Sequence, residues 1–171
     1  MDYKKAASFW IKKDETSKKL CREALEKEIR EFAQSHTFCA LATADLEGNV
    51  RCTPMEYFLM DDKFWMLTEG GLKFRGLEQN KNVALAIFDT GEGFGDTKGM
   101  QISAKAEVIE PWSEEYLALL DHVHIPAEKI KSLPEPLNLL KITPESIDLL
   151  LGKLKKEGYS SRQHWEKDCA D

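Results

Sequence analysis

The chain has 171 residues, of which 42% are hydrophobic and 32% are charged, and its formal net charge at pH 7 is -6. This length suffices for one domain with a sizeable core, and the composition is that of a globular protein. The negative charge argues against nucleic acids and anionic membranes as partners, because binding to either needs concentrated lysine and arginine. No apolar run is long enough to span a membrane and the first residues lack the apolar core of a signal peptide, so we expect a cytoplasmic protein.

The sequence predicts no metal site. The four cysteines form no CxxC pair, which argues against zinc and thioredoxin-like chemistry. We interpret Cys21 and Cys39 as small buried hydrophobic residues in a reducing compartment. His122 and His124 share a His-x-His spacing, but no cysteine or carboxylate completes a plausible set of ligands.

The first 35 residues are predicted to form helices. A short helix is expected over residues 1–14, and a second one follows N-cap candidates at Asp14, Thr16 and Ser17. In the second helix the apolar residues recur at helical spacing and charged residues fill the other face. We expect this amphipathic helix to pack on a barrel, with His36 as a surface or capping residue at its end.

Three strand-like runs follow, over Phe38–Ala44, Asn49–Leu59 and Lys63–Thr68. Each run is rich in β-forming residues, and the connections between them are short. The first connection ends at Gly48, which suits a tight hairpin. The pattern predicts an antiparallel meander, after which Gly70-Gly71 breaks the last strand and a short helix begins.

The rest of the chain predicts further strands and one more helix. The predicted strands are Val83–Phe88, Gly99–Glu110, Leu137–Thr143 and Ser146–Leu151, and a helix is expected from Ser113 to about His122. The glycines of the 91–95 segment do not form a phosphate loop, because the surrounding loop carries three acids and no base. We therefore predict one mostly β domain over 1–171, with N-terminal helices (1–35), a barrel of six or seven antiparallel strands (36–151) and a polar tail (152–171).

Several short motifs follow one another within this barrel: Leu41-Ala42-Thr43, the turn ending at Gly48, Arg51-x-Thr53-Pro54, the Phe64–Thr68 strand, Lys73, and Leu77-x-x-Asn80. Their order and spacing resemble the pyridoxamine 5'-phosphate oxidase-like family of FMN-binding split β-barrels, over roughly residues 36 to 150. The resemblance implies a split barrel that forms a homodimer with its cofactor sites at the subunit interface. It also implies that the FMN cofactor performs the chemistry, and the sequence assigns no catalytic residue.

The resemblance assigns FMN contacts to six residues, Arg51, Cys52, Thr53, Pro54, Thr68 and Lys73. Lys73 is expected to meet the phosphate with its charge, helped by free NH groups at the start of its helix. Arg51 and Thr53 alternate onto one strand face and are expected at the phosphate or the ring edge. Thr68 can bond a ring carbonyl, and Pro54 interrupts strand hydrogen bonding and leaves a place for a ligand. Cys52 lies in the same strand and could sit near the cofactor.

The chain departs from the family's strong pyridoxamine phosphate oxidases at several positions. It has Gly71-Leu72-Lys73 where they carry Ser-Arg-Lys, Thr53 where they place an arginine for the FMN phosphate, and Phe58 where they place a lysine for the substrate phosphate. We therefore predict an FMN-dependent oxidoreductase acting on an unidentified small substrate rather than on vitamin B6. The alternatives are a flavin-binding electron carrier or redox sensor, and a relative that binds haem or a deazaflavin.

Two further expectations concern surfaces. A barrel of this size leaves aromatic residues such as Phe58, Trp65 and Phe94 to be covered, and a second subunit would cover them. The tail segment Arg162–Trp165 is either an exposed tail or, by the family resemblance, a segment that reaches a flavin.

Overall fold

The computed structural model describes residues 3–89 and 97–168. Its helices are α1 (Tyr3–Glu15), α2 (Arg22–Gln34), α3 (Lys73–Gln79), α4 (Glu114–His122), α5 (Ala127–Lys131) and the 3-10 helix η1 (Gly152–Glu157). Its strands are β1 (Phe38–Ala44), β2 (Val50–Glu56), β3 (Phe58–Met60), β4 (Lys63–Thr68), β5 (Asn82–Asp89), β6 (Lys98–Ile109), β7 (Asn138–Leu151) and β8 (Arg162–Glu166).

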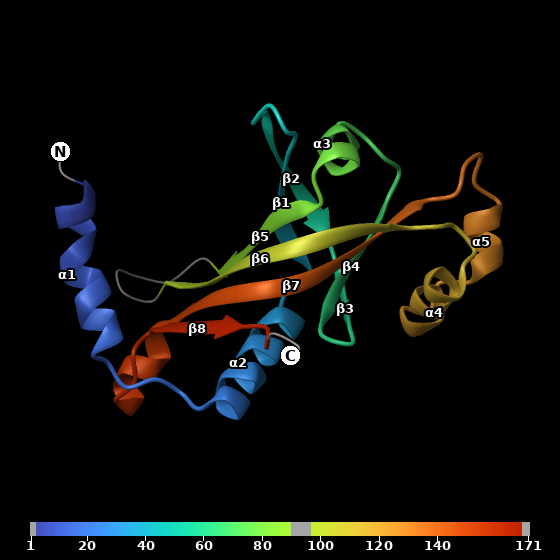
Figure 1. Cartoon of the computed structure of the whole chain (residues 1–171). Helices are drawn as coiled ribbons and strands as arrows, with labels where there is room; N and C mark the ends of the chain where they lie inside the picture. Colours follow the sequence, from blue (N-terminus) through green and yellow to red (C-terminus); the bar gives the residue numbers. More distant parts are fainter. Residues whose placement is uncertain (1–2, 90–96, 169–171) are drawn as a thin grey trace.

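The strands form one antiparallel sheet in the order β2-β1-β5-β6-β7-β4-β3 (Figure 1). Strand β8 pairs with the second half of β7, beyond the segment of β7 that pairs with β4. The sheet curls until β2 and β4 come into contact, so its shape is that of a split barrel. The predicted mostly β fold with flanking helices is confirmed.

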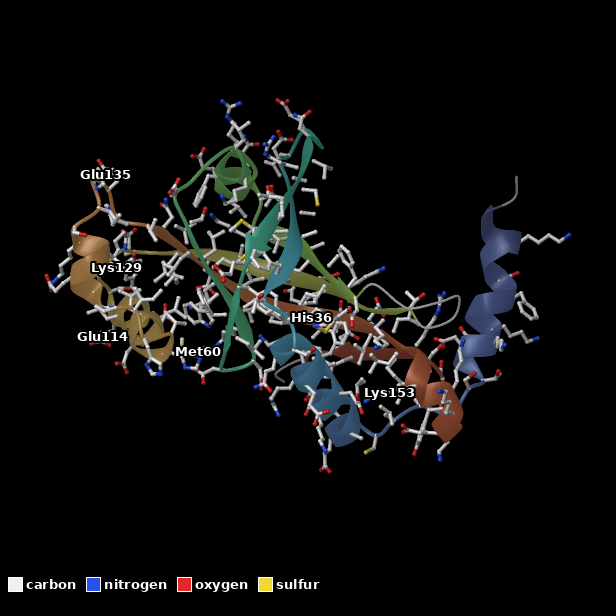
Figure 2. The ribbon with its side chains drawn as sticks, turned by 180° about the vertical axis from the view of Figure 1, so that it is seen from behind. His36, Met60, Glu114, Lys129, Glu135 and Lys153 are labelled. Carbon is white, nitrogen blue, oxygen red and sulfur yellow. The ribbon has the colours of Figure 1, made fainter. Side chains whose placement is uncertain are left out.

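The hydrophobic core has two parts. The larger part lies between α2 and the concave side of the sheet, where Leu25 and Phe32 of α2 meet Leu41, Leu85 and other strand residues. The second part gathers around Trp65 and is covered by α4 and α5, which lie together at one end of the sheet (Figure 1). Seen from behind, Met60 of the β3–β4 hairpin lies on the same side of the molecule as Glu114 of α4 (Figure 2), and the Nε2 atom of His122 in α4 lies 3.3 Å from the carbonyl oxygen of Leu59 in this hairpin.

The signals at the end of α2 and at the start of α4 are confirmed, but the expected N-caps Asp14, Thr16 and Ser17 are wrong, because α2 begins only at Arg22, after Cys21, which makes no side-chain cap bond. The hydroxyl of Ser113 accepts a hydrogen bond from the Tyr116 amide at 3.3 Å and so caps α4. His36 follows the last turn of α2, and its Nδ1 lies 2.9 Å from the carbonyl oxygen of Phe32, which is a capping contact. The expected apolar face of α2 packs on the sheet.

Both hairpins of the predicted three-strand meander form, as β1–β2 and β3–β4, but they do not share a continuous middle strand, so the meander itself is wrong. The expected Asn49–Leu59 strand breaks at Tyr57 into β2 and β3, which lie at opposite edges of the sheet. Tyr57 is buried, and its hydroxyl donates to the carbonyl oxygen of Ala33 at 2.6 Å while its amide donates to Thr37 at 2.8 Å. These contacts fix the chain at Tyr57 beside the end of α2. The chain therefore passes from β2, at one edge of the sheet, to β3, at the other edge.

The two closing strands predicted after Leu137 are one strand, β7. The pairing with β6 shifts between Ser103 and Ala104, so that Glu145 is an extra residue on β7. A β-bulge of this kind lets the strand continue past Pro144. The expectation of a polar tail is also corrected, because residues 152–166 form η1 and β8 and bury Leu154 and Gln163.

The residues expected to need cover from a second subunit are already covered. Trp65 is buried in the second core, and Phe58 packs against it together with α4. Phe94 and the predicted 91–95 loop lie outside the described residues. The exposed large hydrophobic residues of the sheet are instead others, among them Phe38, Val50 and Phe88.

Candidate functional site

The centre of the candidate site is the side chain of Lys73, the first residue of α3, which is only 5% exposed. Its ammonium group donates to the hydroxyl oxygen of Thr68 at 2.8 Å and to the carbonyl oxygen of Gly70. Thr68 ends β4, so two of the predicted site residues are in direct contact. An ammonium has three N–H donors, and these two bonds leave one for a further acceptor.

The turn between β4 and α3 places Lys73 beside the sheet. Gly70 and Gly71 have φ angles of 130° and 108°, a backbone region that other residues rarely adopt. The helix then packs closely on β1, since a Cβ at Gly76 would lie 3.2 Å from the backbone of Ala44. The expectation of free NH groups at the helix start fails for Phe74 and Arg75, whose amides bond to the carbonyls of Gly71 and Leu72.

Strand β2 brings Arg51 and Thr53 to the same side of the sheet. Arg51 pairs across the hairpin with Thr43, and Thr53 pairs with Leu41, and both partners are buried on the concave face. Since paired residues project to the same face, Arg51 and Thr53 do so too. The helix α3, which carries Lys73, contacts both β1 and β2.

The electrostatics of this group favour an anion. Burial lowers the pKa of Lys73 below its ordinary value, and the positive charge of Arg51 lowers it further. Among residues 3–89 and 97–168, no carboxylate forms an ion pair with Lys73 or Arg51. Two cations that repel each other, with only neutral oxygens at the buried one, make a site that a bound anion would stabilise.

Cys52 and Pro54 do not join this group. They pair with Ala42 and Ala40 and therefore project to the convex face of the sheet, where both are exposed. Pro54 does not interrupt β2 either, because the pairing with β1 runs unbroken from Val50 to Glu56. An edge strand tolerates a proline whose missing N–H would point away from its neighbour.

The cysteines differ from one another in their surroundings. Cys39 is buried, and desolvation raises the pKa of its thiol to about 12, with a smaller contribution from Cys52. Cys21 precedes α2 and is exposed, so the expectation that it is buried is wrong. Cys169 lies outside the described residues.

The convex face carries an apolar surface formed by β1, β2 and β5, which we call the outer apolar face. Its most exposed members are Phe38, Val50 and Phe88, with exposed fractions of 63%, 72% and 66%. Between them lie small residues: Ala40, Ala42, Ala84 and Ala86. This face could have been predicted from the sequence, because each of these strands has apolar residues at both sets of alternating positions and therefore on both faces of the sheet.

The strand β8, which the sequence did not predict, places two polar pairs that were missed. His164 faces Asp148 on β7, with its Nδ1 2.8 Å from a carboxylate oxygen. Trp165 projects to the other side, where its ring nitrogen donates to Glu26 of α2 at 2.9 Å. Only the alternation of Gln163 and Trp165 with charged or polar neighbours marked this segment as a strand.

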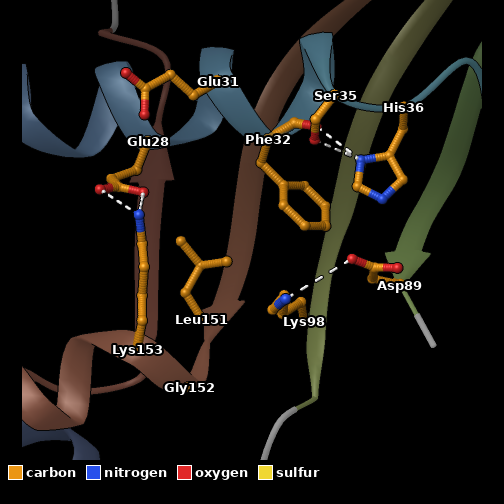
Figure 3. Close-up of a pocket in the computed structure, with 10 residues that line it drawn as sticks. All are labelled: Glu28, Glu31, Phe32, Ser35, His36, Asp89, Lys98, Leu151, Gly152 and Lys153. Carbon is orange, nitrogen blue, oxygen red and sulfur yellow. Dashed lines mark hydrogen bonds and ion pairs between the residues drawn. The ribbon is translucent and has the colours of Figure 1, made fainter. Parts of the chain in front are cut away.

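A hollow of about 260 Å³ below the end of α2 contains many charged groups, but they are matched (Figure 3). Lys153 pairs with Glu28 at 2.7 Å, and Lys98 faces Asp89 at 3.9 Å. Across the described part of the chain, no three His, Cys, Asp or Glu side chains gather as metal ligands do, and no helix is long and apolar enough to cross a membrane. Within residues 3–89 and 97–168, Lys73 therefore differs from Lys153 and Lys98 in having no acidic partner.

The solved structures that resemble the chain include the following three, each at low sequence identity. HutZ, the heme storage protein from Vibrio cholerae, is 22% identical with a TM-score of 0.58, and the match covers 71% of this chain and 90% of that chain. An FAD-binding protein from Mesorhizobium loti is 19% identical with a TM-score of 0.60, covering 77% and 93%. Campylobacter jejuni ChuZ is 16% identical with a TM-score of 0.64, covering 87% of this chain and 62% of that chain. At these identities the likeness shows the fold alone.

The family comparison is stronger. No curated protein matches the chain significantly. The family model described as pyridoxamine 5'-phosphate oxidase, however, matches residues 25–151, which include all the described strands except β8, and also Arg51, Thr53, Thr68 and Lys73. The protein therefore belongs to the pyridoxamine 5'-phosphate oxidase family.

Proposed function

We propose that the protein binds FMN and acts as a flavin-dependent oxidoreductase on a small substrate. The observation that carries the proposal is the buried ammonium of Lys73, which lies near the positive charge of Arg51 and has no acidic partner among the described residues. The phosphate of FMN is an anion of the size and charge that such a site requires. Membership of the family supports a flavin as the group that carries this phosphate.

The same observation supports FMN over FAD. Lys73 provides one buried cationic position, which suits a terminal phosphate, and the sequence contains no Rossmann glycine-rich turn for a pyrophosphate. The Mesorhizobium loti relative is described as FAD-binding, so the choice between the two flavins needs a direct measurement.

The bound flavin would supply hydride or electron transfer at its N5 atom, and the chain would supply binding and orientation. Lys73 and Arg51 would hold the phosphate, Thr53 would lie beside it on the same strand face, and Thr68 would orient the Lys73 ammonium. Phe58 stands where the family's oxidases place a lysine for a substrate phosphate, and it packs into the second core. This supports a substrate other than pyridoxamine phosphate.

The proposal includes a homodimer with the cofactor at the subunit interface. The outer apolar face supports it, because exposed aromatic and aliphatic side chains on a sheet are stabilised when a second copy covers them. The proposal also places the protein in the cytoplasm, where free thiols such as Cys39 remain reduced.

A haem-binding function is the second candidate, and one observation favours it. An imidazole whose Nδ1 bonds a carboxylate is oriented to use its Nε2 as a metal ligand, and His164 stands in this relation to Asp148. The pair borders a hollow of about 540 Å³ that Phe88 and Gly99 also line. The Vibrio cholerae relative is described as a heme storage protein.

Purification without added cofactor, followed by an absorbance spectrum, separates the two candidates. A flavin spectrum with release of FMN, and tighter binding of FMN than of FAD to the apoprotein, is the expected result. A Soret band that disappears in His164→Ala would instead support haem. If a flavin is bound but NAD(P)H and an electron acceptor give no turnover, the protein is a carrier or sensor rather than an oxidoreductase.

A further inference from the structure

Cations also gather away from Lys73, where the end of α1, the helix η1 and the start of β8 meet (Figure 1). They line a hollow of about 310 Å³. Three cationic side chains and three serine hydroxyl groups line it: Lys13, Lys155, Arg162, Ser17, Ser160 and Ser161. Such a mixture is unusual on a chain whose net charge is -6.

Hydrogen bonds fix the frame of this hollow. The segment that joins α1 to α2 is bound to the start of β8, since the Ser160 amide donates to the carbonyl oxygen of Lys18 at 2.8 Å. The buried side chain of Gln163 accepts from the Leu20 amide at 3.0 Å and donates to the carbonyl oxygen of Ser160 at 2.7 Å. The positions of the cations therefore rest on cross-linked backbone, which lowers the entropy lost when a ligand binds.

Of the described residues, Asp14 is the one acid that lines the hollow, and its charge is already compensated. It forms an ion pair with Lys19 at 2.8 Å and accepts a hydrogen bond from Ser160 at 2.7 Å. Burial alone would raise the pKa of Asp14, but these bonds and the charges of Lys19 and Arg162 outweigh burial and lower it. Neither Lys155 nor Arg162 makes an ion pair within the described ranges, so the hollow has an excess of positive charge.

We propose that this hollow binds the phosphate or pyrophosphate group of a small phosphorylated molecule. The Arg162 guanidinium, the Lys155 ammonium and the Ser161 hydroxyl lie around one concave surface, and they are donors of the kind that phosphate oxygens accept from. The volume lies at the low end for small-molecule sites. A long polyanion is disfavoured, because beyond about 8–10 Å of the hollow it would meet the field of a negatively charged protein.

The test is titration of the full-length protein with inorganic pyrophosphate, monitored by calorimetry and by the backbone amide signals of residues 158–163. The double variant Lys155→Gln/Arg162→Gln removes both unpaired cations, and we expect roughly a tenfold or greater loss of affinity. Lys156→Gln is the matched control, since Lys156 is the next exposed residue of η1 but does not line the hollow. Lys73→Ala is a second control that separates this site from the flavin site.

The expected result is saturable binding that shifts the 158–163 amides, is lost in the double variant, and survives both controls. The backbone amide signals of residues 162–166 and a thermal melt show that β8 remains folded in each variant. Three results would overturn the proposal: no binding at millimolar pyrophosphate, equal weakening by Lys156→Gln, or binding of an RNA oligomer or an anionic vesicle without binding of pyrophosphate.

Discussion

The ammonium nitrogen of Lys73 lies 2.8 Å from the hydroxyl oxygen of Thr68, which joins the end of β4 to the start of α3 across the Gly70-Gly71 turn. A neutral hydroxyl orients this buried charge without neutralising it. A carboxylate in the place of Thr68 would satisfy the lysine and leave nothing for a ligand. The pair therefore favours an anion site over a structural ion pair.

Replacement of Thr68 by valine tests this orientation. Valine has nearly the same shape and suits a strand, but it removes an acceptor from a buried ammonium. We expect the apoprotein to lose about 1–3 kcal/mol of unfolding free energy, measured by urea denaturation. Thr68→Ser keeps the hydroxyl and should retain most of that stability. Equal stability of the valine variant and the wild type would show that the bond contributes little.

The lowered pKa of Lys73 predicts a pH dependence of FMN binding. Burial, and then the charge of Arg51, place this pKa below 10.5, so the ammonium loses its proton and its attraction for phosphate before an ordinary lysine does. As the pH rises, the ratio of FMN affinity to riboflavin affinity should therefore fall, and the midpoint of this fall should lie below pH 10.5. Both ligands carry the same ring system, so the ratio cancels ionisation of the ring.

Arg51→Gln sharpens the pH experiment. Removing the nearby charge should move the midpoint to higher pH, but not fully to 10.5, because the larger cause is burial. Fluorescence titrations at a series of pH values provide the measurement. A midpoint that does not move would mean that Arg51 lies outside the electrostatic environment of Lys73.

The outer apolar face predicts a dimer. Phe38→Ser/Phe88→Ser replaces two exposed aromatic residues on β1 and β5 and should convert the dimer to a monomer in light scattering at micromolar concentration. Leu46→Ser is the control, since Leu46 is 77% exposed but lies in the β1–β2 turn. A wild-type protein that is already monomeric would contradict both the dimer and the proposed cofactor site at the subunit interface.

The sequence predicted most of the elements but not how distant strands pair. Local signals such as Gly48, with its φ of 86°, and the Ser113 cap are contained in a few consecutive residues. The break at Tyr57 depends on a hydrogen bond to Ala33, and β8 depends on pairing with β7, so neither is visible in a local pattern. The bulge at Glu145 likewise depends on the register of β6, and Pro144 suggested a break instead.

The candidate site was predicted in part. Alternation along β2 correctly placed Arg51 and Thr53 on one face, and the direct contact between Thr68 and Lys73 brings together two residues chosen separately. The same alternation places Cys52 and Pro54 on the opposite face. They were nevertheless assigned to the site because they belong to the same short motif as Arg51 and Thr53. The role of these residues in binding FMN stays a prediction.

The most direct test of the account is the affinity of Lys73→Ala for FMN and for riboflavin. A charge-assisted hydrogen bond to phosphate is worth about 1.5–3 kcal/mol, so FMN should bind roughly ten- to a hundredfold more weakly, while riboflavin, which has no phosphate, should be almost unaffected. Lys81→Ala is the matched control, because Lys81 caps the other end of α3 through the carbonyl oxygen of Leu77. Unchanged FMN affinity in Lys73→Ala, or an equal loss for FMN and riboflavin, would contradict the phosphate site.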